Sequence, residues 1–162
     1  MEYNVLSVAN EFNRGKHLKY IFFWKNTQPK DNSIDESCLS QWYNCSFTVD
    51  NITYNTAEQY MMSKKALLFH DIQTFERIMN ADNPNQYKRL GRKVKDFDIK
   101  VWKSNRFNIV LDGNLAKFSQ NQGLKDFLLS TKNRVLVEAS PYDTIWGIGL
   151  SADTPNIENP YT

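Results

Sequence analysis

The chain has 162 residues, of which 41% are hydrophobic and 23% charged, the usage of an ordinary globular protein with one self-contained domain. Twenty basic and eighteen acidic side chains leave a formal net charge of +2, which weighs against a dedicated nucleic-acid binder. Phe, Tyr and Trp make up 14% of the residues, a high share that indicates roles beyond filling a core.

The N-terminal third alternates between polar stretches and short β-prone runs. Residues 1–18 are polar and mixed, and we expect them to form a loosely held arm. The β-rich run at 19–24 predicts a strand. Two further β-rich runs, 45–49 and 52–54, flank Asp50-Asn51, which predicts a small hairpin closed by a two-residue turn.

From residue 56 onward the sequence takes on helical character. Thr56 and Gln59 have the spacing of a capping box, which predicts a helix that runs to His70. Asp71 is placed to cap a second helix. Asn83-Pro84 is placed to begin a third, because an N-cap residue followed by proline is typical of a helix start.

A long fourth helix is expected after Asp98, with a kink at Gly113. A short helix at 124–129 and an alternating strand at 134–139 follow, before a loop-like tail. Together these elements predict an α+β fold, mainly α. Residues 19–162 would form a single domain of about five helices with a small β hairpin or sheet.

The sequence carries no signal for a membrane or for export. Its longest run of apolar and aromatic residues, 20–24, is far shorter than the ~20 residues that span a bilayer. The N-terminus lacks the apolar stretch of a signal peptide, so Cys38 and Cys45 are expected to be reduced thiols. We predict a cytoplasmic protein with no membrane partner and no obligate protein partner.

The spacing of potential ligands predicts neither a metal site nor a cofactor. The two histidines, His17 and His70, are far apart, and no Cys/His cluster has zinc spacing. Residues 147–152 fit Gly-x-Gly-x-x-Ala, but too few residues follow for a dinucleotide-binding βαβ unit. We therefore expect no metal and no cofactor.

Glu58 and Lys65 are the first candidates for chemistry. Glu58 would stand second in the helix that follows Thr56, and Lys65 would share its face two turns later. They would line one groove with an acid and an amine. A carboxylate favoured by the helix dipole and a lysine on a solvated face explain the same pattern, so both interpretations stay open.

The stretch after the last predicted strand is the second candidate. It combines Asp143, Trp146 and Gly147 with a proline and a further glycine. Glycines let a ligand approach the backbone, and loops of this kind often carry function. The alternative is a structural aspartate turn in which Trp146 is a plug.

A polar ridge and three tryptophans complete the set. Asn114, Lys117 and Gln120 recur every three residues along the long predicted helix, either as ligand contacts or as a solvent face. The other tryptophans are either core residues or platforms for a planar base or a flavin-like ring, namely Trp24, Trp42 and Trp102. A pocket with a carboxylate, an amine and aromatic rings suits acid/base chemistry on a sugar or heterocycle.

These residues belong to segments that are similar to one known family. The segments are SQWYNCSFTVDNITYNTAEQYMMSKKALLF (40–69), LGR (90–92), FD (97–98), RFNIVLDGNLAKFSQN (106–121), LLST (128–131) and VLVEASPYDTIWGIGL (135–150). In this order they resemble the NADAR superfamily, also called the YbiA-like family. They cover most of residues 20–150.

The resemblance implies a mainly α fold and an N-glycosidase, which hydrolyses the bond between ribose C1 and a nitrogen. YbiA-like members act on phosphorylated ribosylamino-pyrimidines, early intermediates of riboflavin biosynthesis. Similar domains remove ADP-ribose from guanine bases of nucleic acid. The implied partner is thus a phosphorylated ribosylamine or an ADP-ribosyl substrate, and ADP-ribosylated nucleic acid is one form of the latter.

The resemblance also implies roles for residues. The family's Glu, helix Lys and Asp-x-x-Trp-Gly aspartate fall on Glu58, Lys65 and Asp143, which are expected to be catalytic. The residues expected to bind substrate are Trp24, Gln41, Trp42, Arg92, Trp102, Asn114, Lys117, Trp146 and Gly147.

A mechanism follows from these roles. Cleavage builds positive charge at C1, and Glu58 or Asp143 would stabilise that charge or position the attacking water. Lys65 would form a Schiff base with C1 if the ribosylamine opens to an imine and burial lowers the lysine's pKa. The remaining roles are stacking on the heterocycle by Trp102 and Trp146 and phosphate binding by Arg92 and Lys117.

Two features depart from the family pattern. The residue after the family's Glu is commonly His, whereas Gln59 stands here. The family pattern also continues past Asn159-Pro160 with a Trp-x-Gly-x-Asn-Leu-Leu-Gly segment and a final helix, which we expect to be missing from this chain. That would favour an alternative function, a non-catalytic module that binds ADP-ribose or a nucleotide. A structural or interaction protein is a third possibility.

Overall fold

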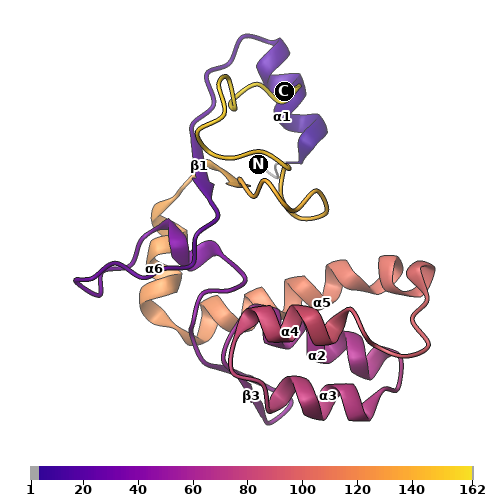
Figure 1. Cartoon of the computed structure of the whole chain (residues 1–162). Helices are drawn as coiled ribbons and strands as arrows, with labels where there is room; N and C mark the ends of the chain where they lie inside the picture. Colours follow the sequence, from indigo (N-terminus) through magenta and orange to yellow (C-terminus); the bar gives the residue numbers. More distant parts are fainter. Residues whose placement is uncertain (1–3, 162) are drawn as a thin grey trace. The chain divides into compact units, whose positions relative to one another are not determined.

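The structure is a computed structural model that describes residues 4–161 (Figure 1). Within that range there are six α-helices, one 3-10 helix and four strands. They are distributed over two compact units, one made of residues 4–40 and 126–161, the other of Gln41–Lys125. The mainly α, α+β fold predicted from the sequence is confirmed, with one helix more than the five expected.

In chain order the elements are α1 (Val5–Asn13), β1 (Tyr20–Phe23), η1 (Glu36–Leu39, the 3-10 helix), β2 (Phe47–Val49), β3 (Ile52–Tyr54), α2 (Ala57–Leu68), α3 (Ile72–Met79), α4 (Pro84–Gly91), α5 (Ile99–Gln120), α6 (Gln122–Ser130) and β4 (Val135–Glu138).

The additional helix is α1, which lies where the sequence predicted a loosely held arm. Its start is a capping box, in which the Asn4 side chain accepts from the Ser7 N–H and the Ser7 hydroxyl accepts from the Asn4 N–H. Val8 is on the buried side of this helix. A serine at the third helical position is a weak signal in sequence, so local propensity did not reveal this helix.

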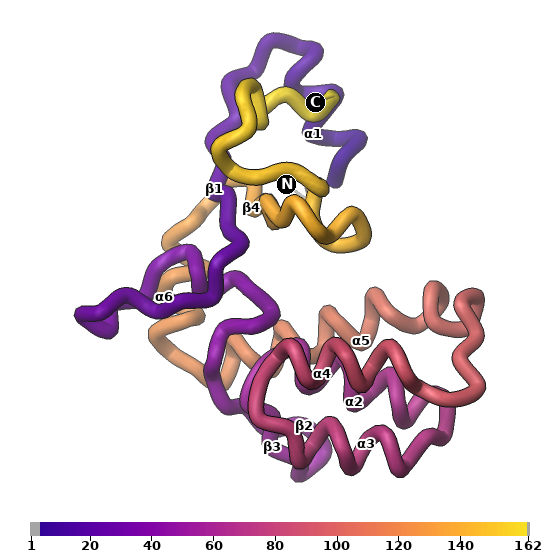
Figure 2. Tube along the Cα trace, viewed as in Figure 1, coloured from indigo at the N-terminus to yellow at the C-terminus, as the bar shows by residue number. Residues whose placement is uncertain are grey.

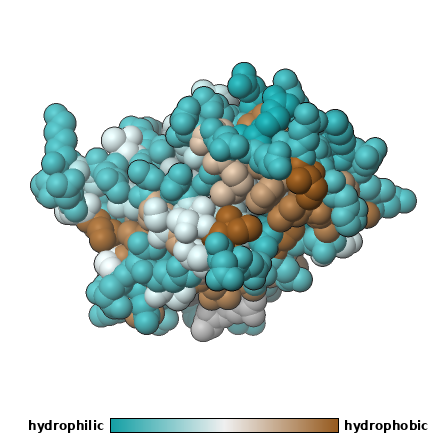
Figure 3. All heavy atoms as spheres, turned by 90° about the horizontal axis from the view of Figure 1, so that it is seen from below, coloured by the Kyte–Doolittle hydropathy of each residue, from teal (hydrophilic) through white to brown (hydrophobic). Residues whose placement is uncertain are grey.

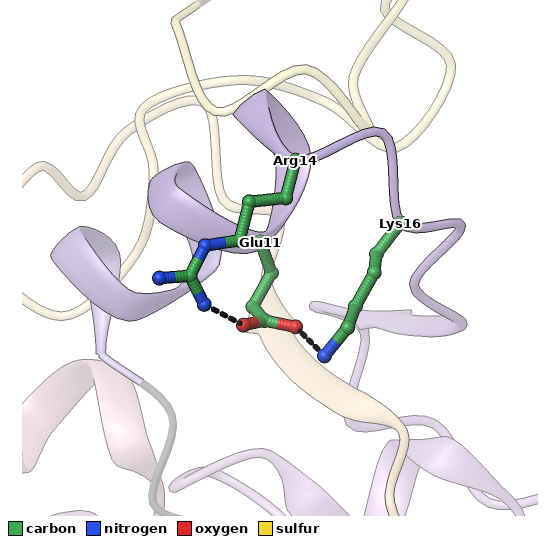
Figure 4. Close-up of polar contacts among 3 residues, drawn as sticks. All are labelled: Glu11, Arg14 and Lys16. Atoms are coloured by element: carbon green, nitrogen blue, oxygen red, sulfur yellow. Dashed lines mark hydrogen bonds and ion pairs between the residues drawn. The ribbon is translucent and has the colours of Figure 1, made fainter.

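A buried carboxylate fixes the C-terminal end of α1. The Glu11 side chain is held between the Arg14 guanidinium, at 3.3 Å, and the Lys16 ammonium (Figure 4). The hydrogen bond from Lys16 and the positive charges of both partners hold the pKa of the Glu11 carboxyl below its ordinary value.

The first unit contains a two-stranded parallel sheet. β1 pairs with β4 from Tyr20 opposite Val135 to Phe23 opposite Glu138 (Figure 2). Because the strands are parallel, the residues that follow both of them emerge at the same edge of the sheet.

The predicted hairpin in the second unit is confirmed. β2 and β3 are antiparallel, with Phe47 opposite Tyr54 and Val49 opposite Ile52. The turn residues, Asp50-Asn51, both have positive φ angles, of 52° and 61°, as a two-residue hairpin turn of this kind requires.

Four of the predicted helix starts are also confirmed. In each, the side chain of the residue before the helix accepts a hydrogen bond from a backbone N–H of the first turn. These N-cap residues are Thr56 for α2, Asp71 for α3, Asn83 for α4 and Asp98 for α5. Helix α5 continues through Gly113 without interruption, and the kink expected there stays a prediction.

Helix α2 is the centre of the second unit and packs against α3, α4 and α5 (Figure 1). Two glycines allow the close approach. A Cβ at Gly91 would lie 2.0 Å from Met62 Sδ, and a Cβ at Gly113 would lie 2.6 Å from Tyr60 Cδ1. The hairpin joins this layer through a buried aromatic cluster, formed by Phe47, Tyr54 and Tyr60.

The face of the molecule drawn in Figure 3 is mostly hydrophilic, with apolar patches between the polar side chains. None of the helices within residues 4–161 is long and apolar enough to cross a membrane.

Candidate functional site

Glu58 lies at the N-terminal end of α2 and is 4% exposed. Thr56, two residues before Glu58, is the N-cap of this helix, so Glu58 lies in its first turn. The backbone N–H of Glu58 donates to the Gln41 carbonyl at 2.9 Å. The chain at Gln41 is therefore bound directly to the start of α2.

Gln41 also connects this end of α2 to α5. Its side-chain amide and that of Asn114 exchange hydrogen bonds of 3.0 and 3.3 Å. The Asn114 amide is oriented in turn by the Val110 carbonyl, at 2.9 Å. Two residues expected to bind substrate, Gln41 and Asn114, thus lie together in the second unit, next to the backbone of Glu58.

Lys65 is half-buried two turns further along α2. Its ammonium donates to the Gly91 carbonyl at the end of α4, at 2.8 Å. It also lies 4.2 Å from the ring centroid of Phe97 and 5.4 Å from that of Trp102. The amine is thus held between a backbone carbonyl and two aromatic rings.

The pKa of Lys65 is lowered from its ordinary value. Burial is the largest cause, because it disfavours the charged form, and the nearby positive charge of Arg92 acts in the same direction. The Glu58 carboxylate acts in the opposite direction. The charges of Glu58 and Arg92, two residues that the sequence assigned to the candidate site, therefore both affect the pKa of Lys65.

The predicted polar ridge of α5 is not a solvent face along its whole length. Gln120 binds the Thr48 backbone through both ends of its amide, at 2.8 Å each, and so attaches α5 to the hairpin. Lys117 is fully buried, with its ammonium 5.7 Å from the Tyr43 ring centroid and 5.0 Å from that of Phe118. In the described structure the Lys117 side chain is part of the interior.

Trp42 and Trp102 have different surroundings in the second unit. Trp102 is buried beside Lys65, whereas Trp42 is half-buried with the Lys88 ammonium 5.8 Å from its ring centroid. Arg92 follows α4 directly and is exposed.

Asp143 organises the loop after β4 in the first unit. One of its carboxylate oxygens accepts from the backbone N–H groups of Ile145 and Trp146, at 2.8 and 3.0 Å. Gly147 is required by the close packing of this turn, since a Cβ there would lie 2.9 Å from the Asp143 carbonyl oxygen and 3.0 Å from that of Glu138. The structural aspartate turn considered for this stretch is therefore present.

Trp24 meets this loop at the edge of the parallel sheet. It follows β1, and its ring lies against that of Tyr142, with centroids 5.9 Å apart and planes inclined by 53°. Trp24, Asp143 and Trp146 consequently belong to the segments that leave β1 and β4 at one sheet edge.

The structure thus groups the predicted site residues in two sets. Glu58 and Lys65 lie on one face of α2 in the second unit, with Arg92 and Trp102 near Lys65. Asp143 belongs to the first unit. That the two carboxylates meet around one sugar stays a prediction, as do the catalytic and binding roles.

Two neighbours of Lys65 were not predicted, the Gly91 carbonyl and the Phe97 ring. Both residues lie in the short segments LGR and FD that carry the family resemblance, and this is the signal that could have identified them. Among residues 4–161 no group of three or more His, Cys, Asp or Glu side chains could hold a metal ion.

Comparisons with known proteins agree with this fold. Residues 22–161 match the NADAR domain family. The chain is 43% identical to the N-glycosidase R617 of Acanthamoeba polyphaga mimivirus, over 83% of this chain and 80% of that protein. It is 30% identical to the riboflavin biosynthesis protein VVA0006 of Vibrio vulnificus, over 80% of this chain but only 33% of the relative.

A solved structure is similar as well. The NMR structure of the Escherichia coli protein YbiA superposes with a TM-score of 0.68 and 29% identity, over 81% of this chain and 73% of that one. The mainly helical fold thus belongs to a recognised class of domain. The chain is a member of the NADAR family, and the family match spans both compact units.

Proposed function

We propose that this protein is an N-glycosidase that hydrolyses a bond between ribose C1 and a nitrogen. The observation that carries the proposal is the pair formed by the buried Glu58 and the half-buried Lys65 on α2, in which Lys65 has a lowered pKa. The names of the mimivirus and E. coli relatives, both N-glycosidases, support the same activity.

The proposed substrate is a phosphorylated ribosylamino-pyrimidine of riboflavin biosynthesis, or ADP-ribose linked to a guanine base. The name of the Vibrio relative supports the first. Both contain a C1–N bond, a phosphate and a planar base. The exposed Arg92 guanidinium would bind phosphate, and Trp102 beside Lys65 would contact the heterocycle.

Glu58 is suited to the developing positive charge at C1. A buried carboxylate stabilises an oxocarbenium-like centre more strongly than an exposed one, because less water screens it. Alternatively the same carboxylate takes a proton from the water that attacks C1. Asp143 stays a second candidate for either role, although its Oδ1 oxygen is already engaged by two backbone N–H groups.

Lys65 is suited to a covalent route. The substrate's ribose ring opens to an imine, and the neutral Lys65 amine adds to C1. The base nitrogen leaves with a proton, so that a lysine–C1 Schiff base remains. Water then adds to C1, releases the sugar as its aldehyde and regenerates the free amine. A lowered pKa increases the fraction of neutral amine that begins this sequence.

The test is turnover by the intact chain on two substrates, a ribosylamino-pyrimidine phosphate and DNA that carries ADP-ribosylated guanine, with released base or sugar measured by chromatography. Glu58→Gln keeps the side-chain shape and removes its charge, so turnover should fall by about 10²–10⁴. Glu76→Gln, on the exposed surface of α3, is the matched control.

Lys65→Arg keeps the positive charge but cannot form a Schiff base, and Lys64→Arg on the same helix is its control. A collapse of turnover only in Lys65→Arg, with borohydride trapping of wild type in the presence of substrate, supports the covalent route. Near-normal turnover in Lys65→Arg would leave Lys65 an electrostatic partner. Binding of either substrate without any turnover by wild type would replace the enzyme with a non-catalytic ADP-ribose or nucleotide-binding module.

A further inference from the structure

The near-neutral net charge conceals a strongly basic tract. Residues 88–106 contain eight lysines and arginines and two aspartates, a net charge of +6. The rest of the chain contains twelve basic and sixteen acidic residues, a net charge of −4. The positive charge is therefore concentrated in about one ninth of the sequence.

The fold brings this tract together at one end of the helical layer in the second unit. It comprises the last residues of α4, the connection at 92–98 and the first two turns of α5, and both helices pack on α2 (Figure 1). One of the two acidic side chains, Asp98, is already engaged by the N–H groups of Lys100 and Val101. The exposed basic residues of the tract are Arg89, Arg92, Lys93, Lys95, Lys100 and Lys103.

Exposed aromatic rings accompany these cations. Phe97 is 42% exposed within the tract, and Phe107, immediately after it, is 66% exposed. Lys100, Lys103 and Phe107 follow the i, i+3, i+7 spacing of one helix face on α5, so charge and ring point in similar directions. Positive charge with exposed rings is the pattern by which proteins hold single-stranded nucleic acid, since phosphates meet the cations and unpaired bases stack on the rings.

We propose that residues 88–107 form a surface that binds the phosphodiester backbone of single-stranded nucleic acid, with Phe97 and Phe107 as stacking positions. The overall charge of +2 suggested the opposite, because it averages the basic tract with an acidic remainder. Charge and exposure define this surface, so it binds unmodified strands even if the protein does not hydrolyse the proposed substrates.

The experiment measures the fluorescence anisotropy of an unmodified, labelled 16-nucleotide single strand between 20 and 200 mM NaCl. Binding should be micromolar at low salt. A surface that contacts four to six phosphates should give a slope of log Kobs against log salt of about −3 to −4, since each contact contributes roughly −0.7.

Two triple charge reversals separate the tract from overall charge. Arg89→Glu, Lys93→Glu and Lys103→Glu together should weaken binding at least tenfold and flatten the salt slope. The control reverses three exposed lysines elsewhere, Lys25→Glu, Lys30→Glu and Lys132→Glu, with the same change in net charge and less than a threefold effect. Urea unfolding midpoints verify that both variants fold.

Phe107→Ser tests the stacking role and should weaken single-strand binding about fivefold or more. Equal losses in the two triple variants would overturn the proposal, as would the absence of binding at 20 mM salt. Tighter binding to the matching duplex, or equal competition by polyglutamate or by anionic lipid vesicles, would also overturn it, because the surface would then recognise negative charge alone.

Discussion

Gly113→Ala tests the close packing of α5 on α2. The added Cβ would lie 2.6 Å from Tyr60 Cδ1 and 3.0 Å from Cε1, whereas carbon atoms pack best at about 3.5–4.0 Å. The Tyr60 ring is 3% exposed, and its centroid lies 5.0 Å from that of Tyr54 and 6.0 Å from that of Phe47. The ring or the helix must therefore move by about 1 Å within a filled cluster.

Overpacking of this kind costs about 1–3 kcal/mol, and alanine in a helix interior recovers up to about 1 kcal/mol. The free energy of unfolding should fall by about 1–2 kcal/mol, which lowers the Tm by about 2–8 °C for a chain of this length. Urea denaturation followed by circular dichroism measures the loss. In a Tyr60→Leu background the same substitution should be neutral or stabilising. A Gly113→Ala protein as stable as wild type would refute the close contact.

The remaining predictions concern charges and the neighbours of Lys65. Gly91→Ala should displace Met62 and the carbonyl that accepts from Lys65, so that both stability and turnover fall. Gly113→Ala should lower stability alone. Urea denaturation and turnover assays on both variants compare the two effects. Because the pKa of Lys65 is lowered in the folded state, its contribution to stability rises with pH from that lowered value up to the ordinary 10.5. A covalent route should also accelerate over the lower part of that range. Unfolding free energy and turnover measured against pH should show both effects in wild type and neither in Lys65→Arg, and identical profiles for the two proteins would contradict the lowered pKa. The pKa of Glu11 is lowered, so its stabilising effect is fully present above about pH 4.5 and is lost as the pH falls through the lowered value. The urea midpoints of wild type and Glu11→Gln should therefore converge as the pH is lowered below about 4.5, and a difference that stays constant down to acid pH would contradict the assignment. Purified protein should carry no stoichiometric zinc or flavin, which elemental analysis and absorbance spectra can check.

Local signals in the sequence predicted the local structure. Thr56, Asp71, Asn83 and Asp98 each cap a helix through a hydrogen bond to a residue two or three positions away, so the sequence pattern contains both partners. The hairpin turn is equally local. The positions of Glu58 and Lys65 on one face of α2 follow from the helical repeat alone. The family resemblance added the expected activity, which spacing could not name.

Contacts between distant segments were decided only by the tertiary structure. The parallel pairing of β1 with β4 joins segments more than 100 residues apart, and no local pattern encodes that register. The same holds for the surroundings of Lys65, because its acceptor and its rings come from α4, the following connection and α5. Lys117 is the clearest example of a residue whose environment the sequence did not predict. Its spacing predicted a polar ridge, but packing against Tyr43 and Phe118 made it an interior residue, and burial is a property of the folded neighbours rather than of the residue itself.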